Sequence, residues 1–160
     1  MAIKDQLPPL LVFGGDWDRC CGEAYAIFSR DFLERTASCL GTPVHVDKRK
    51  IGSDKVESFW HVTSTTDRAT GNKLPDINRL VRIRWIRALI DNASAADVLC
   101  WRYKEGNGPV RVYIWARDAE FVVILEEIMG RKFLRLVTAF IVGYDSKKRD
   151  LMKRYDDRIR

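Results

Sequence analysis

Long apolar runs are missing from this sequence of 160 residues. No run approaches the roughly 18 apolar residues that a membrane-spanning helix needs, which excludes such a helix. The opening segment, MAIKDQLPPLL, has no signal-peptide pattern, so we expect no leader. Hydrophobic residues still make up 46% of the chain, which is enough to build a core and excludes whole-chain disorder. We therefore expect one domain over 1–160, with 1–15 as an N-terminal arm.

Cysteine and histidine are scarce, and their spacing fits no common metal centre. Of the four cysteines, Cys20 and Cys21 are adjacent, which matches neither a CxxC pair nor a disulfide framework. With only His45 and His61 and no tight carboxylate cluster, we expect no catalytic metal and no cofactor. P-loop, GxGxxG, HExxH and GxSxG motifs are absent, which excludes the enzyme classes that depend on them. A reduced, cytoplasmic protein is the expectation.

Acidic residues are outnumbered, 22 against 28 Lys and Arg, and the formal net charge is +6. The excess lies entirely in the second half of the chain. Residues 1–80 hold 11 basic and 11 acidic side chains, whereas residues 81–160 hold 17 and 11. A basic half suits a polyanionic partner, because phosphate contacts release counterions. A solvated basic surface without such a partner is the alternative.

The spacing of apolar residues predicts helices in the first half of the chain. One helix is expected over about 16–40, ended by Gly-Thr-Pro at 41–43, and a second from Asp76 through about Ile90. Between them, the apolar segment 59–62 is typical of a short strand, and 63–73 of a loop.

After Ala96 the pattern changes to segments of strand length that are rich in β-branched and aromatic residues. Their connections are too short for parallel crossovers, so we predict an antiparallel meander of four strands over 98–103, 110–115, 120–126 and 132–142. A basic helix follows from about Ser146. The fold class is then α+β, with N-terminal helices packed on one face of a four-stranded antiparallel sheet and the other face free to meet a ligand.

The second predicted helix carries four arginines in nine residues, without an acid between Ile77 and Ile90: Arg79, Arg82, Arg84 and Arg87. They form two i, i+3 pairs that leave the helix in two directions. The planar guanidinium group binds phosphate bidentately, so the segment is a candidate phosphate site. The alternative for each arginine is structural pairing with Asp91, Asp97, Glu126 or Glu127.

Four other residues are candidates for chemistry. His61 lies at the end of an element, and an imidazole suits acid–base work at neutral pH. Thr138 lies on the strand face that we expect it to share with Leu134, Leu136 and Phe140, where a buried hydroxyl needs a partner. Tyr144 and Lys147 follow that strand and suit phosphate binding or acid catalysis. Structural roles are the alternatives: a core histidine, a strand threonine and a solvated helix start.

The segments FWHVTST, NRLVRIRWIRALIDN, VRVYIWARDAEFVVILEE and FLRLVTAF, with the basic C-terminal helix, resemble phage-associated nuclease-like proteins. These belong to the barnase–EndoU–colicin–RelE (BECR) superfamily and are sometimes called phage-related proteins. The resemblance covers most of 10–155, and RIRW and LVTAF are its most specific parts. It implies helices followed by a curved antiparallel sheet whose concave face holds the site.

The resemblance also implies a metal-independent endoribonuclease, in which the ribose 2′-hydroxyl attacks the adjacent phosphate to give a 2′,3′-cyclic phosphate. A toxin held by a cognate antitoxin or immunity protein is one role within this class, with tRNA or mRNA as substrate. The catalytic candidates are His61, Arg82, Arg87 and Thr138. The candidates for nucleic-acid binding are Arg79, Arg84, Trp85, Arg102, Arg111, Tyr144 and Lys147.

Two other functions are open at this point. The first is a nucleic-acid-binding module without catalysis, which would stack bases on exposed aromatic residues: Trp85, Trp101, Tyr103, Tyr113 and Trp115. The second is a partner-binding domain whose basic half docks an acidic protein.

Overall fold

The computed structural model describes all residues from Met1 to Arg160 and has no helix long and apolar enough to cross a membrane. Its helices are α1 (Ile3–Gln6), α2 (Trp17–Phe28), the π-helical turn Ser29–Leu33, α3 (Glu57–Thr63), α4 (Ile77–Leu80), α5 (Ile83–Asp91) and α6 (Asp145–Asp156). Its strands are β1 (Ala37–Cys39), β2 (Thr42–His45), β3 (Ser64–Thr66), β4 (Lys73–Pro75), β5 (Val98–Lys104), β6 (Val110–Ala116), β7 (Phe121–Glu127) and β8 (Leu134–Ile141).

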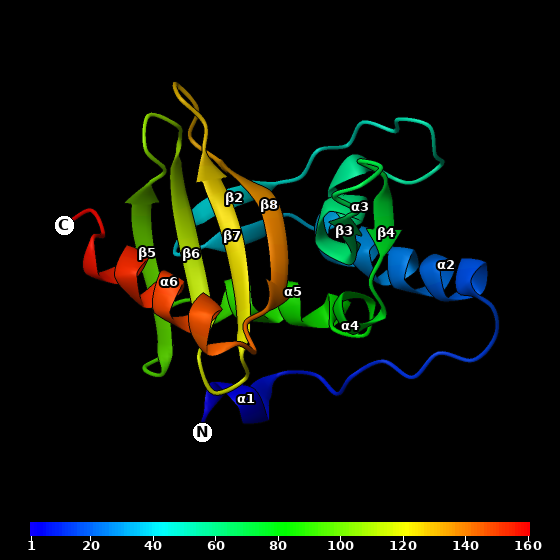
Figure 1. Cartoon of the computed structure of the whole chain (residues 1–160), viewed down its shortest axis with the longest axis horizontal. Helices are drawn as coiled ribbons and strands as arrows, with labels where there is room; N and C mark the ends of the chain where they lie inside the picture. Colours follow the sequence, from blue (N-terminus) through cyan, green and yellow to red (C-terminus); the bar gives the residue numbers. More distant parts are fainter.

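The main sheet has six strands, in the order β1-β2-β8-β7-β6-β5, and forms a half-barrel (Figure 1). Strands β5 to β8 are antiparallel to their neighbours, but β2 runs parallel to β8 through the pairs Val44–Leu134 and His45–Arg135. The prediction of a four-stranded antiparallel sheet is therefore wrong. The sheet is larger and mixed because the hairpin of β1 and β2 adds to the free edge of β8.

This hairpin also corrects the helix expected over about 16–40, because the helical part of the segment ends at Leu33. Leu40 and Gly41 both adopt positive φ angles, 49° and 88°, as the central residues of a two-residue hairpin turn require. The Gly-Thr-Pro sequence at 41–43 therefore reverses a strand and does not end a helix. The buried residues Ala37, Cys39 and Val44 attach the hairpin to the core.

The inner face of the half-barrel holds the main core. Helix α5 packs there against β1, β6 and β7, and its buried side chains are Ile83, Ile86, Leu89 and Ile90. Alternate strand residues such as Val112, Ile114, Val123 and Leu125 point into the same cluster. An amphipathic helix on an alternating sheet face thus accounts for this layer.

The outer face is covered by α6, which crosses the strands in Figure 1, so the expected free face is not found. Trp101, Tyr113 and Trp115 lie in a cluster with Leu151 of α6 and are 4%, 3% and 2% exposed. Trp85 and Tyr103 are half-buried. The prediction of a surface with five exposed aromatic residues for base stacking is therefore wrong as well. Helix α6 packs an apolar side chain on the sheet face that we expected to be open.

Three segments between residues 57 and 91 differ from expectation. Residues 59–62 lie in α3, where Phe59, Val62 and Thr63 are buried at helical spacing. Part of the expected loop 63–73 forms β3, which pairs with β4. Asp76 does cap a helix, accepting from the backbone N–H groups of Asn78 and Arg79. The helix is interrupted after α4, because the Val81 carbonyl accepts from Leu11 and so is not paired within the helix.

The segment 1–15 lies along α5 (Figure 1). Ile3 is fully buried, and its backbone N–H donates to the Asp97 carboxylate at 2.8 Å. Further along, the Pro8 and Pro9 carbonyls accept from the Trp85 indole and the Arg84 guanidinium, at 2.6 and 2.7 Å. These contacts hold the segment against the helix that carries the arginines.

Candidate functional site

A β-bulge in β8 takes Thr138 off the inner face of the sheet. Ile124 pairs with Thr138, whereas the next residue of β7, Leu125, pairs with Leu136, so one residue of β8 has no partner. Leu134 and Leu136 point into the inner core. The extra residue changes the alternation, so Thr138 does not share the face of Leu134 and Leu136 as we expected, and Phe140, two residues further on, packs on the outer cluster.

Thr138 links three elements through its hydroxyl group. The hydroxyl donates to the backbone carbonyl of His61 at 3.1 Å and accepts from Nη1 of Arg79 at 3.4 Å. The same nitrogen of Arg79 donates to the Ser64 carbonyl at 3.1 Å. Helices α3 and α4 are thereby tied to β8 beyond the point where β2 stops pairing with it.

The charge of Arg79 is only weakly compensated. The nearest carboxylate is that of Asp76, whose Oδ2 lies 3.8 Å from Nε and whose other oxygen caps α4. Burial lowers the pKa of Arg79, and the Asp76 carboxylate opposes that shift. A half-buried guanidinium whose one ion pair is long, at 3.8 Å, is suited to bind an anion, because the anion would add to that partial compensation.

Aromatic rings lie next to this guanidinium. Its Cζ is 5.8 Å from the centre of the Phe140 ring, and Nζ of Lys147 is 5.5 Å from the same ring. Lys147 also lies 5.9 Å from the ring centre of Tyr144, which is 72% exposed at the start of α6. We name Arg79, Thr138, Phe140, Tyr144 and Lys147 the β8-edge cluster. It combines two cations and two aromatic rings with the hydroxyl of Thr138, which contacts Arg79.

His61 borders the cluster through its backbone, and its side chain lies in a charged environment. The imidazole is exposed and makes no hydrogen bond within the protein. Burial and the nearby Lys73 ammonium lower its pKa from the ordinary 6.5, against the opposing effects of Glu57 and Asp47. A lowered pKa keeps the imidazole neutral at pH 7, which is the form that accepts a proton.

The other arginines of the 79–87 segment have structural partners. Arg87 pairs with Asp91 at 3.1 Å and donates to the Asp31 carbonyl at 2.6 Å. Arg84 and Trp85 hold the N-terminal segment, as described above, and Trp85 also packs edge-on against Phe121. These three residues lie away from the β8-edge cluster.

Arg82 lies between the β8-edge cluster and the arginines that have structural partners. Its Nη1 donates to the Asn78 carbonyl at 2.8 Å, and its Cζ is 5.1 Å from the Trp85 ring centre. Burial lowers the pKa of Arg82, and no carboxylate is within ion-pair distance. It adds a positive charge one turn from Arg79.

Arg102 and Arg111 occupy other parts of the sheet. Arg102 of β5 forms a bidentate pair with Glu127 at 2.6 and 2.9 Å, and this bond raises its pKa. Arg111 of β6 lies 3.6 Å from Glu126, a buried carboxylate that also binds Arg135. Both of these candidates are therefore paired with glutamates, Glu127 and Glu126, which the sequence offered as partners for the arginines of the 79–87 segment instead.

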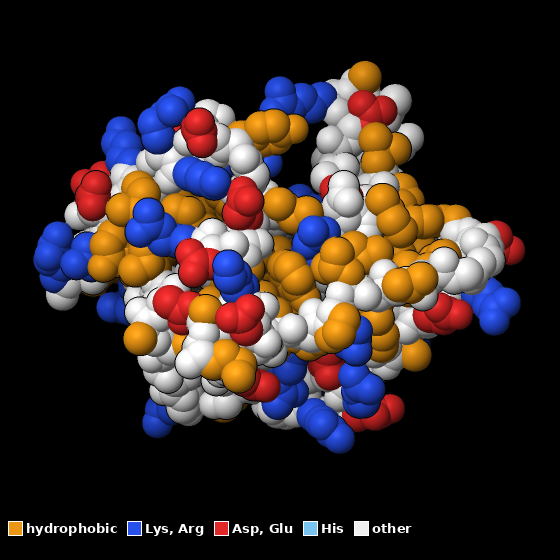
Figure 2. All heavy atoms as spheres, turned by 90° about the horizontal axis from the view of Figure 1, so that it is seen from below, with side chains coloured by type: hydrophobic (Ala, Val, Ile, Leu, Met, Phe, Trp, Pro, Cys, Tyr) orange, Lys and Arg blue, Asp and Glu red, His pale blue; other side chains and the backbone are white.

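The sequence reasoning missed Phe140 and Ser64 as parts of the site. Phe140 was one more apolar strand residue, and only its contacts with Arg79 and Lys147 give it another role. Ser64 contributes a backbone carbonyl, for which the residue type gives no signal. Net charge does not mark the site either. Seen from below, Lys and Arg side chains lie among acidic and apolar ones and form no single basic field (Figure 2).

No group of three or more His, Cys, Asp or Glu side chains is placed to hold a metal ion. No family model, curated protein or solved structure matches the chain.

Proposed function

We propose that this chain is a metal-independent endoribonuclease whose site is the β8-edge cluster together with His61. The observation that carries the proposal is the weakly compensated guanidinium of Arg79, held by Thr138 beside the ring of Phe140 and the cation of Lys147. The resemblance of the FWHVTST, RIRW and LVTAF segments to BECR nucleases supports the same function.

In this proposal the cluster binds one nucleotide step of single-stranded RNA. Arg79 and Lys147 contact the scissile phosphate, where their charges stabilise the phosphorane as it forms. The exposed Tyr144 ring offers a base a surface for stacking, which is sequence-tolerant. Thr138 is a positioning residue, because its hydroxyl orients Arg79 and anchors the end of α3.

His61 accepts the proton of the ribose 2′-hydroxyl in the proposed reaction. The 2′-oxygen then forms a bond to phosphorus, the bond from phosphorus to the 5′-oxygen breaks, and a 2′,3′-cyclic phosphate results. The departing 5′-oxygen takes a proton from Tyr144 or Lys147. Arg82 adds positive charge nearby, whereas Arg87, paired with Asp91, takes no part.

The test is incubation of the purified protein with total RNA and labelled tRNA in EDTA. We expect discrete fragments that end in 2′,3′-cyclic phosphate, and we expect the variant His61→Ala to lose them. His45→Ala is the matched control, because His45 is also exposed but stacks on Phe133, 4.2 Å between ring centres. Cleavage that persists in His61→Ala at the wild-type rate would remove His61 from the mechanism.

A non-catalytic RNA-binding module is the second candidate, favoured by the lack of any hydrogen bond that orients the His61 imidazole. Its signature is intact RNA that the protein retains at low salt and releases at high salt. Under the first proposal, tRNA or mRNA of the cytoplasm is the substrate, and a cognate antitoxin or immunity protein is a partner that a toxin would need.

A further inference from the structure

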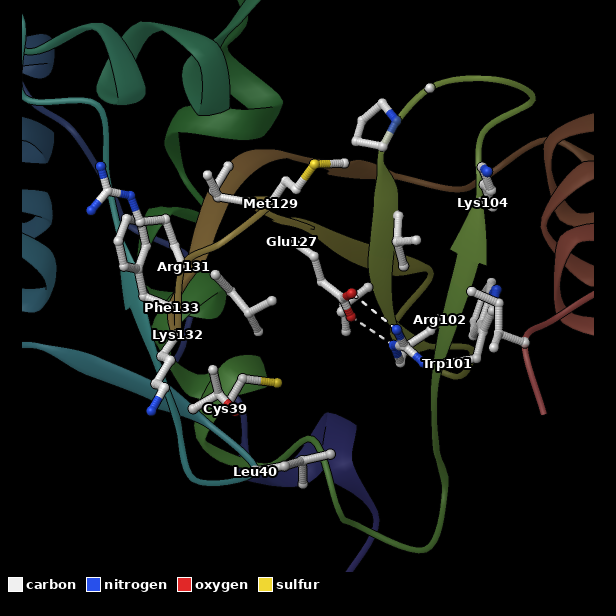
Figure 3. Close-up of a pocket in the computed structure, with 18 of the residues that line it drawn as sticks. Cys39, Leu40, Trp101, Arg102, Lys104, Glu127, Met129, Arg131, Lys132 and Phe133 are labelled. Atoms are coloured by element: carbon white, nitrogen blue, oxygen red, sulfur yellow. Dashed lines mark hydrogen bonds and ion pairs between the residues drawn. The ribbon is translucent and has the colours of Figure 1, made fainter.

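A second cationic region lies inside the half-barrel, on the opposite side of the sheet from α6. Helix α5 fills only part of the inner face. Beyond it, a cavity of about 1080 Å³ opens between the hairpin of β1 and β2 and strand β5. The β5–β6 and β7–β8 connections form its rim (Figure 3). We name this cavity the half-barrel pocket.

The pocket has an apolar floor and an exposed apolar rim. Half of its 22 lining residues are hydrophobic, and Cys39, Val112 and Leu134 form buried parts of the floor. At the rim, Met129 is 99% exposed and Leu40 is 63% exposed. Exposed apolar side chains at both ends of an apolar floor (Figure 3) are costly in water and typical of surfaces that bind another molecule.

The pocket is also positively charged. Five lining residues are basic, and Glu127 is the only acidic one. Figure 3 shows Arg131 and Lys132 on one side of the pocket, with Arg102 and Lys104 on the other. Glu127 is bound by Arg102, so it does not compensate the remaining cations. Arg131, Lys132 and Lys104 have no ion-pair partner. We call these three uncompensated cations at the rim of the apolar floor the fringe.

The half-barrel pocket has no free aromatic ring on which an RNA base could stack. The pocket's two aromatic residues are Trp101, which is 4% exposed and stacked on Tyr113, and Phe133, which is stacked on His45. Strand addition is also obstructed at the β5 edge, since the Ile159 N–H donates to the Arg102 carbonyl at 2.9 Å. A ligand therefore has to bind through side chains, with aliphatic groups on the floor and acidic groups at the fringe.

We propose that the half-barrel pocket docks an acidic, amphipathic helical segment of a partner protein, with its aliphatic side chains on the pocket floor and its carboxylates facing Lys104, Arg131 and Lys132. Charge complementarity identifies this occupant, because an apolar floor within a fringe of cations matches a helix with one aliphatic and one acidic face. The inference stands apart from the proposed ribonuclease site, which uses none of these residues.

The test measures fluorescence anisotropy of a labelled helical peptide of about 16 residues with Leu on one face and Glu on the other. The double variant Arg131→Glu/Lys132→Glu should weaken binding at least about tenfold, because it places like charges opposite each other. The matched control is Lys4→Glu/Lys153→Glu, which reverses two exposed lysines outside the pocket and should leave the affinity unchanged. A peptide with Ser in place of Leu, and the protein variant Met129→Ser, should both bind more weakly.

Three outcomes would overturn the proposal. The first is a peptide that does not bind. The second is an affinity that the pocket variant and the control change equally. The third is an oligouridylate that displaces the peptide and is itself weakened by Arg131→Glu/Lys132→Glu, which would make the pocket an RNA site. RNA cleavage measured on the same variants separates this inference from the ribonuclease proposal.

Discussion

The β8-edge cluster and the half-barrel pocket are both cationic, yet their cations have different surroundings. In the cluster, Arg79 and Lys147 lie beside aromatic rings and a hydroxyl group. In the pocket, Arg131 and Lys132 lie at one side of a floor of aliphatic and thiol groups (Figure 3). Positive charge attracts any polyanion, so the neighbouring groups decide between partners. Rings and hydroxyls suit RNA, whereas an aliphatic floor suits a protein.

The variant Arg79→Gln gives the largest expected effect. Removing the charge at the proposed phosphate site should lower the rate of RNA cleavage by about 100-fold, as for other groups that stabilise a charged transition state. Initial rates on a labelled RNA in EDTA provide the measurement, with thermal unfolding to confirm the fold. The pocket variant Arg131→Glu/Lys132→Glu should cleave at the wild-type rate. Equal losses in both variants would erase the distinction between the two regions.

The variant Thr138→Val tests whether the Thr138 hydroxyl positions the cluster. It removes one donor and one acceptor, so the His61 carbonyl and Arg79 each lose a partner. We expect a loss of about 1 kcal/mol in the free energy of unfolding, typical of such hydrogen bonds. Cleavage should fall about tenfold, and Thr138→Ser should recover most of it. Full activity in Thr138→Val would show that Arg79 needs no such support.

The salt dependence of RNA binding separates the two regions on a finer scale. Loss of one phosphate contact should reduce the slope of log K against log salt by about 0.7 for single-stranded RNA. We expect that reduction for Lys147→Gln and no change for Lys104→Gln in the pocket, measured by titration of an oligouridylate at several salt concentrations. A changed slope for Lys104→Gln alone would move the RNA site to the pocket.

The smallest expected effect concerns the pH profile. The pKa of His61 lies below its ordinary value, so cleavage that needs a neutral imidazole should decline at a lower pH than an unperturbed histidine would give. The Lys73 ammonium contributes to this shift, and Lys73→Gln should therefore raise the pKa and move the acid limb to higher pH. Glu57→Gln should move the limb in the opposite direction. NMR titration of the imidazole, together with pH–rate profiles, provides the measurement.

Local patterns predicted much of the second half of the chain. Alternation and turn residues located the four strands from β5 to β8, and Asp76 was correctly expected to cap a helix. The first half was less predictable. The segment 16–40 has helical spacing throughout, but its end pairs with 42–45 once Leu40 and Gly41 turn the chain. Propensity could not reveal that pairing, because the parallel contact with β8 supports it from far along the sequence.

The sequence predicted which residues belong to the candidate site better than it predicted which of them lie together. Arg79, Thr138, Tyr144 and Lys147 were singled out, and they lie together in the structure. Nothing in the spacing of the four arginines separated Arg79 from Arg87, which Asp91 neutralises. Helical spacing predicts on which side of the helix an arginine lies. It does not predict which residue of another helix or strand the arginine contacts on that side.

The sequence by itself determined the basic second half, the scarcity of metal ligands, and the strand and helix patterns that demand an α+β core. Only the tertiary structure decided which charges stay uncompensated. A bulge of one residue took Thr138 off the inner face of the sheet, and α6 covered the face expected to be open. A half-barrel that α5 fills only partly left the pocket. The reason is that compensation of charge and burial of a face depend on contacts between distant segments, which local sequence does not specify.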